Sequence, residues 1–116
     1  MPLIKLQTSV ECPKEKKEEI TLELSRICAE GIGKPEAYVA SVVEDDAVIA
    51  FGGAISPAAY VEVKSIGGLN SEVNNRLSAM ICQSLEKLLD IPGDHTYINF
   101  TDVSAQNWGC NSSTFG

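Results

Sequence analysis

Apolar and polar positions recur along the first half of the chain in a pattern that predicts strand, helix, strand. Residues 3–10 are rich in strand formers, and a charged stretch then begins a helix. Four apolar side chains at three- and four-residue spacing form the predicted buried stripe of this helix: Ile20, Leu24, Ile27 and Cys28. Gly33 and Pro35 are helix-stopping residues, and residues 38–43 read as the second strand.

The second half of the chain repeats this order. Residues 59–64 predict a strand, residues 65–68 a turn, and residues 97–101 a last strand. The helix between them starts at about Asn70, with Asn70 or Ser71 able to cap its exposed amides. Its apolar stripe comprises five residues: Val73, Leu77, Ile81, Leu85 and Leu88. Between the halves, residues 48–51 predict a short extended piece before Gly52-Gly53.

The two halves together predict an α/β fold in one domain, residues 1–116. Two β-α-β units with right-handed crossovers give a four-stranded mixed sheet with both helices on one face. Alternation along the strands places polar residues such as Lys5, Glu62, Lys64 and Asn99 on the other face. That face is too polar for a second core, so we expect solvent or a wet subunit interface there.

Composition and charge limit the classes of function. Hydrophobic residues make up 44% and charged residues 22% of the chain, as in an ordinary globular protein. A net charge of −7 argues against nucleic acid as a partner. No apolar run approaches the roughly 20 residues that span a bilayer, and Lys5 interrupts any signal-peptide core. We therefore expect no membrane partner and a cytoplasmic location, with leaderless export left open.

Cysteine and histidine usage gives no sign of a metal site or a cofactor. Cys12, Cys28, Cys82 and Cys110 contain no C-x-x-C pair, so free thiols are expected, and no disulfide framework. Cys28 and Cys82 lie at apolar helix positions, where cysteine acts as a small hydrophobic residue. The single histidine, His95, lies beside a turn and is expected to be exposed and not catalytic. Walker and dinucleotide-binding motifs are missing.

Pro2 is the one position with unusual chemistry. Removal of Met1 would leave Pro2 with a free secondary amine at the start of a strand. The plain alternative is structural, because the first residue of a strand tolerates the missing N–H of proline.

Five motifs resemble the macrophage migration inhibitory factor family across the whole chain: Met1-Pro2 and residues 33–38, 65–69, 97–100 and 111–115. The resemblance implies the duplicated β-α-β fold, assembled as a homotrimer with active sites between adjacent subunits. It also implies a keto–enol tautomerase of the phenylpyruvate tautomerase type, an isomerase that needs no cofactor and acts on a small aromatic keto or enol acid.

By this resemblance Pro2 is the general base and acid. A free α-amino group titrates near ~8, so the pKa of Pro2 must fall if the amine is to be neutral. Burial and a neighbouring cation both lower an amine pKa, and Lys34 is the candidate cation. Lys34 could also bind the substrate carboxylate; otherwise it is a cation at a helix C-terminus. Ile66 would offer a backbone group to the substrate.

The resemblance also implies a set of residues around the substrate. Asn99 and Tyr97 would reach it from the neighbouring subunit, although Tyr97 could be an interface aromatic only. Tyr38 and Phe115 would line the pocket. Trp108 precedes Gly109 here, whereas in vertebrate members of the family a tryptophan follows the glycine, so the aromatic rim is rearranged and Cys110 beside it could be an accessible thiol.

Two further functions stay open at this point. The protein could be a cytokine-like signalling protein that binds a receptor, if exported, and keeps the pocket without a physiological catalytic role. It could also be a structural trimer or small-ligand carrier. The family's C-x-x-C is absent at residues 57–61, so thiol–disulfide oxidoreductase activity by that route is not expected.

Overall fold

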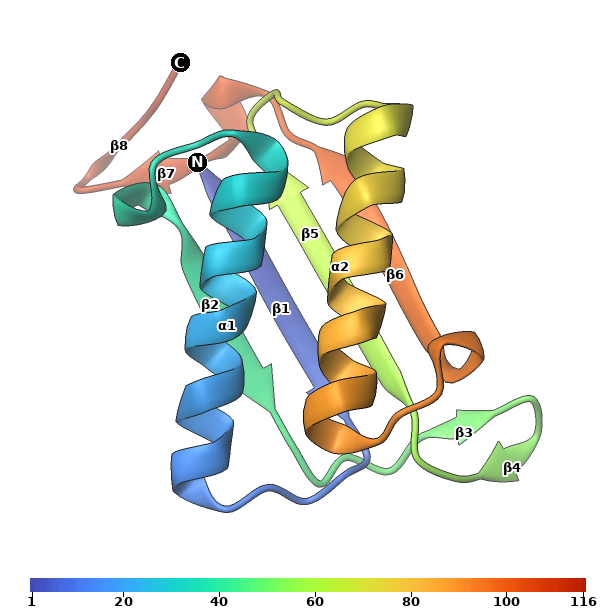
Figure 1. Ribbon diagram of the computed structural model, residues 1–116. Helices are drawn as coiled ribbons and strands as arrows, with labels where there is room; N and C mark the ends of the chain where they lie inside the picture. The colour runs from blue at the N-terminus through green and yellow to red at the C-terminus, as the bar shows by residue number, and fades with distance from the viewer.

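A four-stranded sheet covered on one face by two antiparallel helices forms the protein in the computed structural model, which describes residues 1–116 (Figure 1). The first unit consists of β1 (Pro2–Thr8), α1 (Lys14–Ile32) and β2 (Ala40–Glu44). The second consists of β5 (Ala59–Ser65), α2 (Ser71–Leu89) and β6 (Thr96–Asp102). The predicted duplicated β-α-β fold is confirmed.

The order of strands in the sheet is β2-β1-β5-β6. Each unit contributes a parallel pair, β1 with β2 and β5 with β6, because a helical crossover returns the chain in the same direction. The two units meet through β1 and β5, which run antiparallel with Pro2 opposite Ser65 and Thr8 opposite Ala59. The sheet is therefore mixed, as predicted.

Shorter elements decorate the two ends of the sheet. A two-residue turn at Gly52 and Gly53, both with positive φ, joins β3 (Ala50–Phe51) to β4 (Ala54–Ile55). Near the C-terminus, β7 (Gly109–Cys110) pairs with β8 (Ser113–Thr114). Three 3-10 helices complete the chain: η1 (Glu36–Tyr38), η2 (Gly93–His95) and η3 (Ala105–Asn107).

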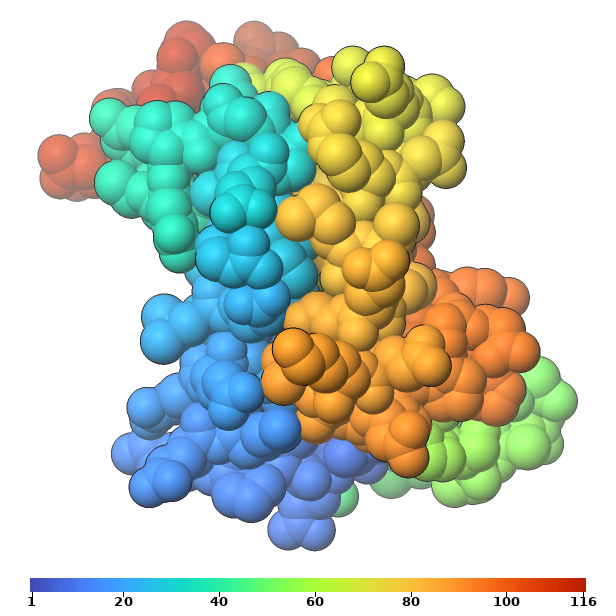
Figure 2. All heavy atoms as spheres, viewed as in Figure 1, coloured from blue at the N-terminus to red at the C-terminus, as the bar shows by residue number.

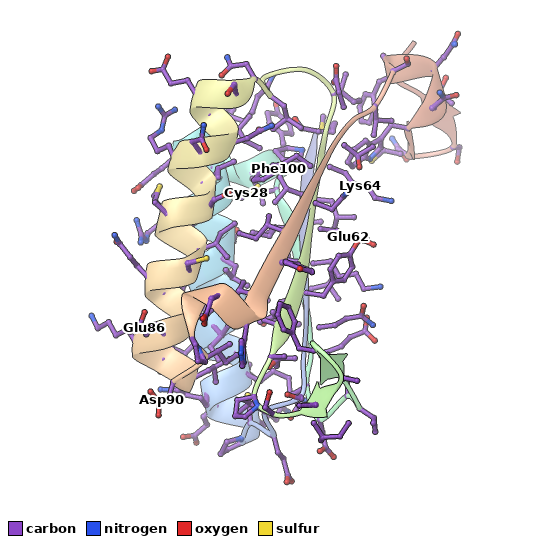
Figure 3. The ribbon with its side chains drawn as sticks, turned by 90° about the vertical axis from the view of Figure 1, so that its right-hand side faces the viewer. Cys28, Glu62, Lys64, Glu86, Asp90 and Phe100 are labelled. Atoms are coloured by element: carbon purple, nitrogen blue, oxygen red, sulfur yellow. The ribbon has the colours of Figure 1, made fainter.

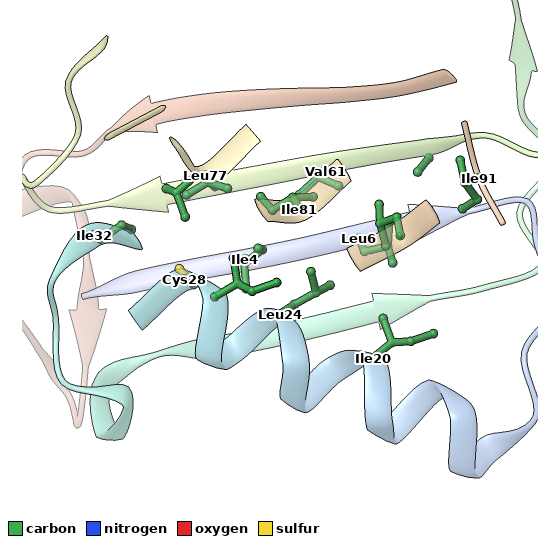
Figure 4. Packing of buried hydrophobic residues seen from close by; sticks show 14 of the residues in the cluster. Ile4, Leu6, Ile20, Leu24, Cys28, Ile32, Val61, Leu77, Ile81 and Ile91 are labelled. Atoms are coloured by element: carbon green, nitrogen blue, oxygen red, sulfur yellow. The ribbon is translucent and has the colours of Figure 1, made fainter. Parts of the chain in front are cut away.

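The core lies between the helices and the sheet (Figure 4). Leu24 of α1 and Ile81 of α2 are 0% exposed, as are Ile4 and Val61 of the strands beneath them. Burying each such side chain contributes roughly 1.5–3 kcal/mol. The predicted stripes of both helices supply this core, although Val73 and Leu88 at the ends of the α2 stripe are only half-buried. No helix in the chain is both long and apolar enough to cross a bilayer.

The other face of the sheet carries polar side chains, as the alternation predicted. Glu62 and Lys64 project from it, away from the helices (Figure 3). Lys5 forms an ion pair with Glu44 at 3.2 Å, and the hydroxyl of Tyr60 donates to the carboxylate of Glu62 at 3.2 Å. The face that carries these contacts is uncovered within one chain.

Two expectations from the sequence are wrong in detail. Tyr38 does not begin a strand: it ends η1, and β2 begins two residues later, because Tyr38 and Val39 donate backbone hydrogen bonds within a 3-10 turn. His95 is half-buried rather than exposed, because its ring stacks on Phe51 with ring centroids 5.0 Å apart.

Candidate active site

The N-terminal end of β1 brings together the chemical groups that the sequence singled out. Pro2 is the first residue of the strand, where its missing N–H costs no ladder hydrogen bond. Its side chain is buried on the helix-covered side of the sheet. The chain terminus is therefore held at the edge of the core, beneath the end of α1 (Figure 1).

The terminal amine lies in surroundings that disfavour its charged form. With Met1 in place, the amine belongs to Met1, and its pKa is lowered by burial first and by the positive charge of Lys34 second. Cys28 of α1 lies beside it, and burial raises the pKa of that thiol to about 11. Cys28 is therefore a neutral, apolar wall at neutral pH rather than a counter-ion for the amine.

The end of α1 fixes Lys34. Gly33 takes the left-handed conformation with φ 79°, and its N–H donates to the carbonyl of Ala29 at 2.9 Å. The chain thereby turns back over the sheet and brings Lys34 close enough to the amine to lower its pKa. Lys34 itself is half-buried and makes no ion pair, so its charge is free to act on a ligand.

Gly68 makes room for this arrangement. A Cβ added there would lie 2.7 Å from Ile32 Cγ2 and 3.5 Å from Lys34 Cε, and the backbone has a φ of 81°. Both the space and the conformation therefore require glycine. This is a physical reason for the second glycine of the turn after β5.

The turn after β5 also points a backbone donor at the terminus. The N–H of Ile66 donates to the carbonyl oxygen of Met1 at 3.4 Å. Asp102 at the end of β6 holds this turn, because its carboxylate accepts from the N–H of Gly67 at 3.0 Å. Ser65 adds a second tie by donating to the carbonyl of Gly67 at 2.7 Å. Removal of Met1 would leave the Ile66 N–H without this partner.

A cavity of about 360 Å³ opens at the same end of the sheet. It lies under the segment that follows β6, with Trp108 half-buried in its wall. Its lining comprises Leu3, Lys64, Val103, Asn107, Trp108 and Gly109. The predicted rim residue Trp108 is thus placed at a cavity next to β1. Phe115 is 43% exposed, and its N–H donates to the carbonyl of Trp108 at 3.1 Å, which ties the C-terminal hairpin to this rim.

Tyr97 and Asn99 lie away from Pro2 within one chain. Tyr97 pairs across the sheet with Tyr60 and through it with Gln7, five residues along β1 from Pro2. Strand spacing and rise then separate Tyr97 from Pro2 by roughly 20 Å, and Asn99 by roughly 14 Å. Both side chains are exposed on the uncovered face, whereas Pro2 faces the helices. Only a second copy of the chain can bring them to Pro2.

Tyr38 also stands apart from the buried groups. It is 57% exposed at the end of η1, four residues after Lys34. A pocket role for Tyr38 therefore needs a ligand or a second subunit that extends over this turn.

Other depressions lie on the surface away from the start of β1. A depression of about 230 Å³ lies between the two helices, on the face shown in Figure 2. Arg26 at its edge is already paired with Glu23 and Glu30. The structure contains no group of three or more His, Cys, Asp or Glu side chains that could hold a metal ion.

Sequence reasoning missed several residues at the Pro2 end. Asp102 was not singled out from the sequence, and Leu3, Lys64, Val103 and Asn107 were not linked to a site. Register across the sheet is the signal that could have found them, because Lys64 lies opposite Leu3 and Asp102 opposite Ser65. Register between separate strands is not readable from one sequence.

The fold and the terminal amine site define a small α/β protein with two β-α-β units and its polar groups gathered at the start of the first strand. The model of the macrophage migration inhibitory factor family matches residues 1–116. The chain therefore belongs to that family, within the tautomerase superfamily.

Individual relatives agree with this placement. A macrophage migration inhibitory factor homolog from Trichuris trichiura is 37% identical over 116 residues, covering 99% of this chain and 100% of the relative. The macrophage migration inhibitory factor of Xenopus laevis is 33% identical over 115 residues, covering 99% of each chain. The crystal structure of a homologue from Prochlorococcus marinus superposes with a TM-score of 0.93 at 42% identity, covering 98% of this chain and 99% of that one.

Proposed function

We propose that the protein is a keto–enol tautomerase of the phenylpyruvate tautomerase type, with the amine of Pro2, freed by removal of Met1, as general base and acid. The observation that carries the proposal is the convergence of three groups on the start of β1. These are a chain terminus at the edge of the core, the unpaired Lys34 and the N–H of Ile66.

The proposed reaction moves one proton and needs no cofactor. The lone pair of the Pro2 nitrogen takes a proton from the carbon next to the substrate carbonyl. The C–H electron pair forms the C=C bond, and the carbonyl π pair moves to oxygen. The protonated amine then gives its proton to that oxygen, so the enol forms and Pro2 is neutral again.

A neutral amine at physiological pH is the first requirement of this reaction. Burial and Lys34 already lower the pKa of the amine when it belongs to Met1. Without Met1, the amine moves one residue closer to the core, so the same two causes act on Pro2. The neighbouring thiol of Cys28 adds no negative charge that would oppose them at neutral pH.

Recognition of an α-keto acid is the second requirement. The ammonium of Lys34 can pair with the substrate carboxylate. The Ile66 N–H, now bonded to the Met1 carbonyl oxygen at 3.4 Å, would donate to a substrate oxygen after Met1 is removed. The Met1 carbonyl thus marks where an oxygen of the substrate would lie.

We propose further that the working site is shared between subunits of a homotrimer. Tyr97 and Asn99 are exposed on the uncovered face and are separated from Pro2 in their own chain by roughly 14–20 Å. Tyr97 is 67% exposed, and the ring of Phe51 in the β3–β4 hairpin lies against it with centroids 4.7 Å apart. Ile55 of this hairpin is 74% exposed and Val48 just before it is 92% exposed, which supports burial of this region against another copy. In this arrangement Asn99 and Tyr97 of one subunit contact substrate held by Pro2 of the next, with Tyr38, Trp108 and Phe115 around the pocket.

Two measurements test the proposal together. Intact mass of the purified protein should show loss of Met1, and ultraviolet absorbance should follow enolisation of phenylpyruvate. Pro2→Gly replaces the secondary amine with a primary one on an unhindered carbon, and should lower kcat/KM by at least ~100-fold. Pro57→Gly, an exposed proline outside the site, is the matched control. Full activity in Pro2→Gly, or Met1 retained in active protein, would contradict the mechanism.

The cytokine-like alternative predicts a different result for the same variant, Pro2→Gly. If the pocket has no physiological catalytic role in a receptor-binding protein, Pro2→Gly should leave receptor-level signalling unchanged even where it abolishes turnover of keto acids. Absence of turnover by the native protein would contradict the tautomerase and leave the signalling function.

A further inference from the structure

The cavity beside Trp108 has a composition that the proposed proton transfer does not explain. It lies on the uncovered side of the sheet, whereas Pro2 faces the helices. Leu3 and Val103 give it apolar walls, Trp108 gives it an aromatic one, and Lys64 is the only charged residue in its lining. An apolar cavity with one cation is typical of a site for an amphiphilic anion.

The charge of Lys64 is not used inside the chain. Lys5, on the same face of the sheet, is neutralised by Glu44 at 3.2 Å, whereas Lys64 makes no ion pair. The nearest acidic residue along its own strand face is Glu62, whose carboxylate accepts from the Tyr60 hydroxyl at 3.2 Å. Figure 3 shows Lys64 projecting from the sheet just below the C-terminal segment that covers the cavity. Its ammonium is therefore available to a ligand.

The cavity is close to the proton-transfer site. Lys64 pairs with Leu3, the residue next to Pro2. Adjacent Cα atoms are ~3.8 Å apart and paired Cα atoms ~5 Å apart, so the Lys64 backbone lies within about 10 Å of Pro2. Pro2 is the first residue of β1, so after removal of Met1 its nitrogen lies at the end of the strand, and a small molecule with an aromatic ring in the middle can pass the strand end to reach both places.

We propose that Lys64 and Trp108 form a second anion subsite, so that the preferred substrate is an aromatic keto acid with a second carboxylate at the far end of its ring. The proposal rests on the proposed function for the identity of the reacting end. The keto acid end is held at Lys34 and Ile66, the ring lies against the Trp108 indole and the walls formed by Leu3 and Val103, and the distal carboxylate pairs with Lys64. The same site would bind a substrate without the distal carboxylate more weakly.

Trp108 provides a direct readout of this subsite because it is the only tryptophan in the chain. Its fluorescence in the processed full-length protein should change when a dianion such as 4-(carboxymethyl)benzoate is added. Phenylacetate, which lacks the second carboxylate, should bind at least ~10-fold more weakly, a difference of ~1.4 kcal/mol.

Three variants assign the difference to Lys64. Lys64→Met removes the charge and keeps the length of the side chain, and should bring the affinities for the dianion and for phenylacetate within about twofold of each other. Lys64→Arg should keep most of the preference because it keeps the charge. Lys5→Met, a charge loss on the same face but outside the cavity, should leave the preference unchanged. Equal affinities in the unaltered protein, or a preference that survives Lys64→Met, would overturn the proposal.

Turnover gives the second arm of the experiment. 4-Carboxyphenylpyruvate should be enolised with a lower KM than phenylpyruvate, and Lys64→Met should raise the KM for the first substrate at least ~5-fold while leaving kcat nearly unchanged. If neither keto acid is turned over but the dianion still binds through Lys64, the tautomerase proposal fails and the subsite stands. If both are turned over with equal KM and Trp108 does not distinguish the two ligands, the subsite fails and the tautomerase stands.

Discussion

The two halves of the protein share one architecture but differ at the point where chemistry would occur. Both helices have 19 residues, and each buried position of α2 has a buried counterpart in α1: Leu77 matches Ile20, Ile81 matches Leu24, and Leu85 matches Cys28. β1 starts at the chain terminus, whereas β5 starts at Ala59, after the buried Ala58. Duplication therefore supplies the scaffold twice, whereas the proposed Pro2 amine has no counterpart at the start of β5.

The ends of the two helices differ in the same way. Both chains turn back through a left-handed residue, Gly33 after α1 and Asp90 after α2. The next residue is the unpaired Lys34 in the first half and Ile91, which is 0% exposed, in the second. Where the first half has an amine and a cation, the second has an amide nitrogen and an apolar side chain. The difference between the halves that the proposed catalysis uses lies in the terminus and one turn, not in the fold.

The largest expected effect comes from turning the Pro2 nitrogen into an amide, as the backbone nitrogen at the start of β5 already is. An alanine inserted between Met1 and Pro2 leaves the processed protein with an Ala-Pro start, so the Pro2 nitrogen becomes an amide with no basic lone pair. We expect the kcat/KM for phenylpyruvate to fall by at least ~100-fold.

The inserted alanine should leave the melting temperature unchanged, because the structure already accommodates Met1 at this place. Intact mass verifies the Ala-Pro start. An inserted protein that keeps its activity would show that the asymmetry between the halves is not catalytic.

The two halves should contribute about equally to the free energy of unfolding. Leu24→Ala and Ile81→Ala each remove a fully buried side chain from equivalent helix positions, and each should lower the free energy of unfolding by about 2–5 kcal/mol. Denaturant titration measures both, with Leu22→Ala, on the exposed side of α1, as the control within ~0.5 kcal/mol. If only one of the two variants lost a large part of its free energy of unfolding, the other helix would contribute little to the common core.

The charge of Lys34, which has no counterpart after α2, is the next feature to test. Lys34→Met removes the cation that lowers the pKa of the terminal amine, so that pKa should rise. Because the neutral amine is the active base, the acidic limb of the pH dependence of kcat/KM should move to higher pH. Loss of the ion pair with the substrate should also lower kcat/KM by about 10-fold at neutral pH.

Lys14→Met, an exposed lysine at the other end of α1, is the control for overall charge. If the acidic limb of the pH dependence of kcat/KM did not move in Lys34→Met, Lys34 would not be a cause of the lowered pKa of the amine.

The smallest expected effect concerns Asp102, which supports the turn that carries Ile66. Asp102→Ala removes the acceptor for the Gly67 N–H at 3.0 Å and should lower kcat/KM about 3–10-fold, mainly through KM. Asp102→Asn keeps an acceptor oxygen and should restore most of the activity. Equal losses in both variants would show that charge, rather than the position of the turn, is what Asp102 contributes.

The fold was predictable from the sequence because its signals are local. The stripe around Leu24 and Ile81 follows from apolar spacing, and the start of α2 follows from the Asn70 side chain, which accepts from the Val73 N–H at 2.9 Å. The start of β2 was misplaced because Tyr38 has the side chain of a strand former but lies in a 3-10 turn, whose backbone hydrogen bonds decide its conformation. His95 was misplaced because its partner, Phe51, comes from a distant hairpin.

The candidate site was predictable only in part. Pro2, Lys34 and Ile66 were identified through motifs, and the structure brings their segments together at the start of β1. Lys64 and Asp102 depend on the register between β1, β5 and β6, which no local pattern specifies. The contribution of Tyr97 and Asn99 depends on a second chain, so it stays a prediction.

The central claim is that the amine of Pro2 is neutral at physiological pH because of where it lies. Nuclear magnetic resonance titration of the Pro2 nitrogen in the processed protein measures this directly. We expect the pKa of Pro2 to lie below the ~8 of an ordinary α-amino group, and to rise in Lys34→Met. A Pro2 pKa at or above that ordinary value, unchanged in Lys34→Met, would contradict the account.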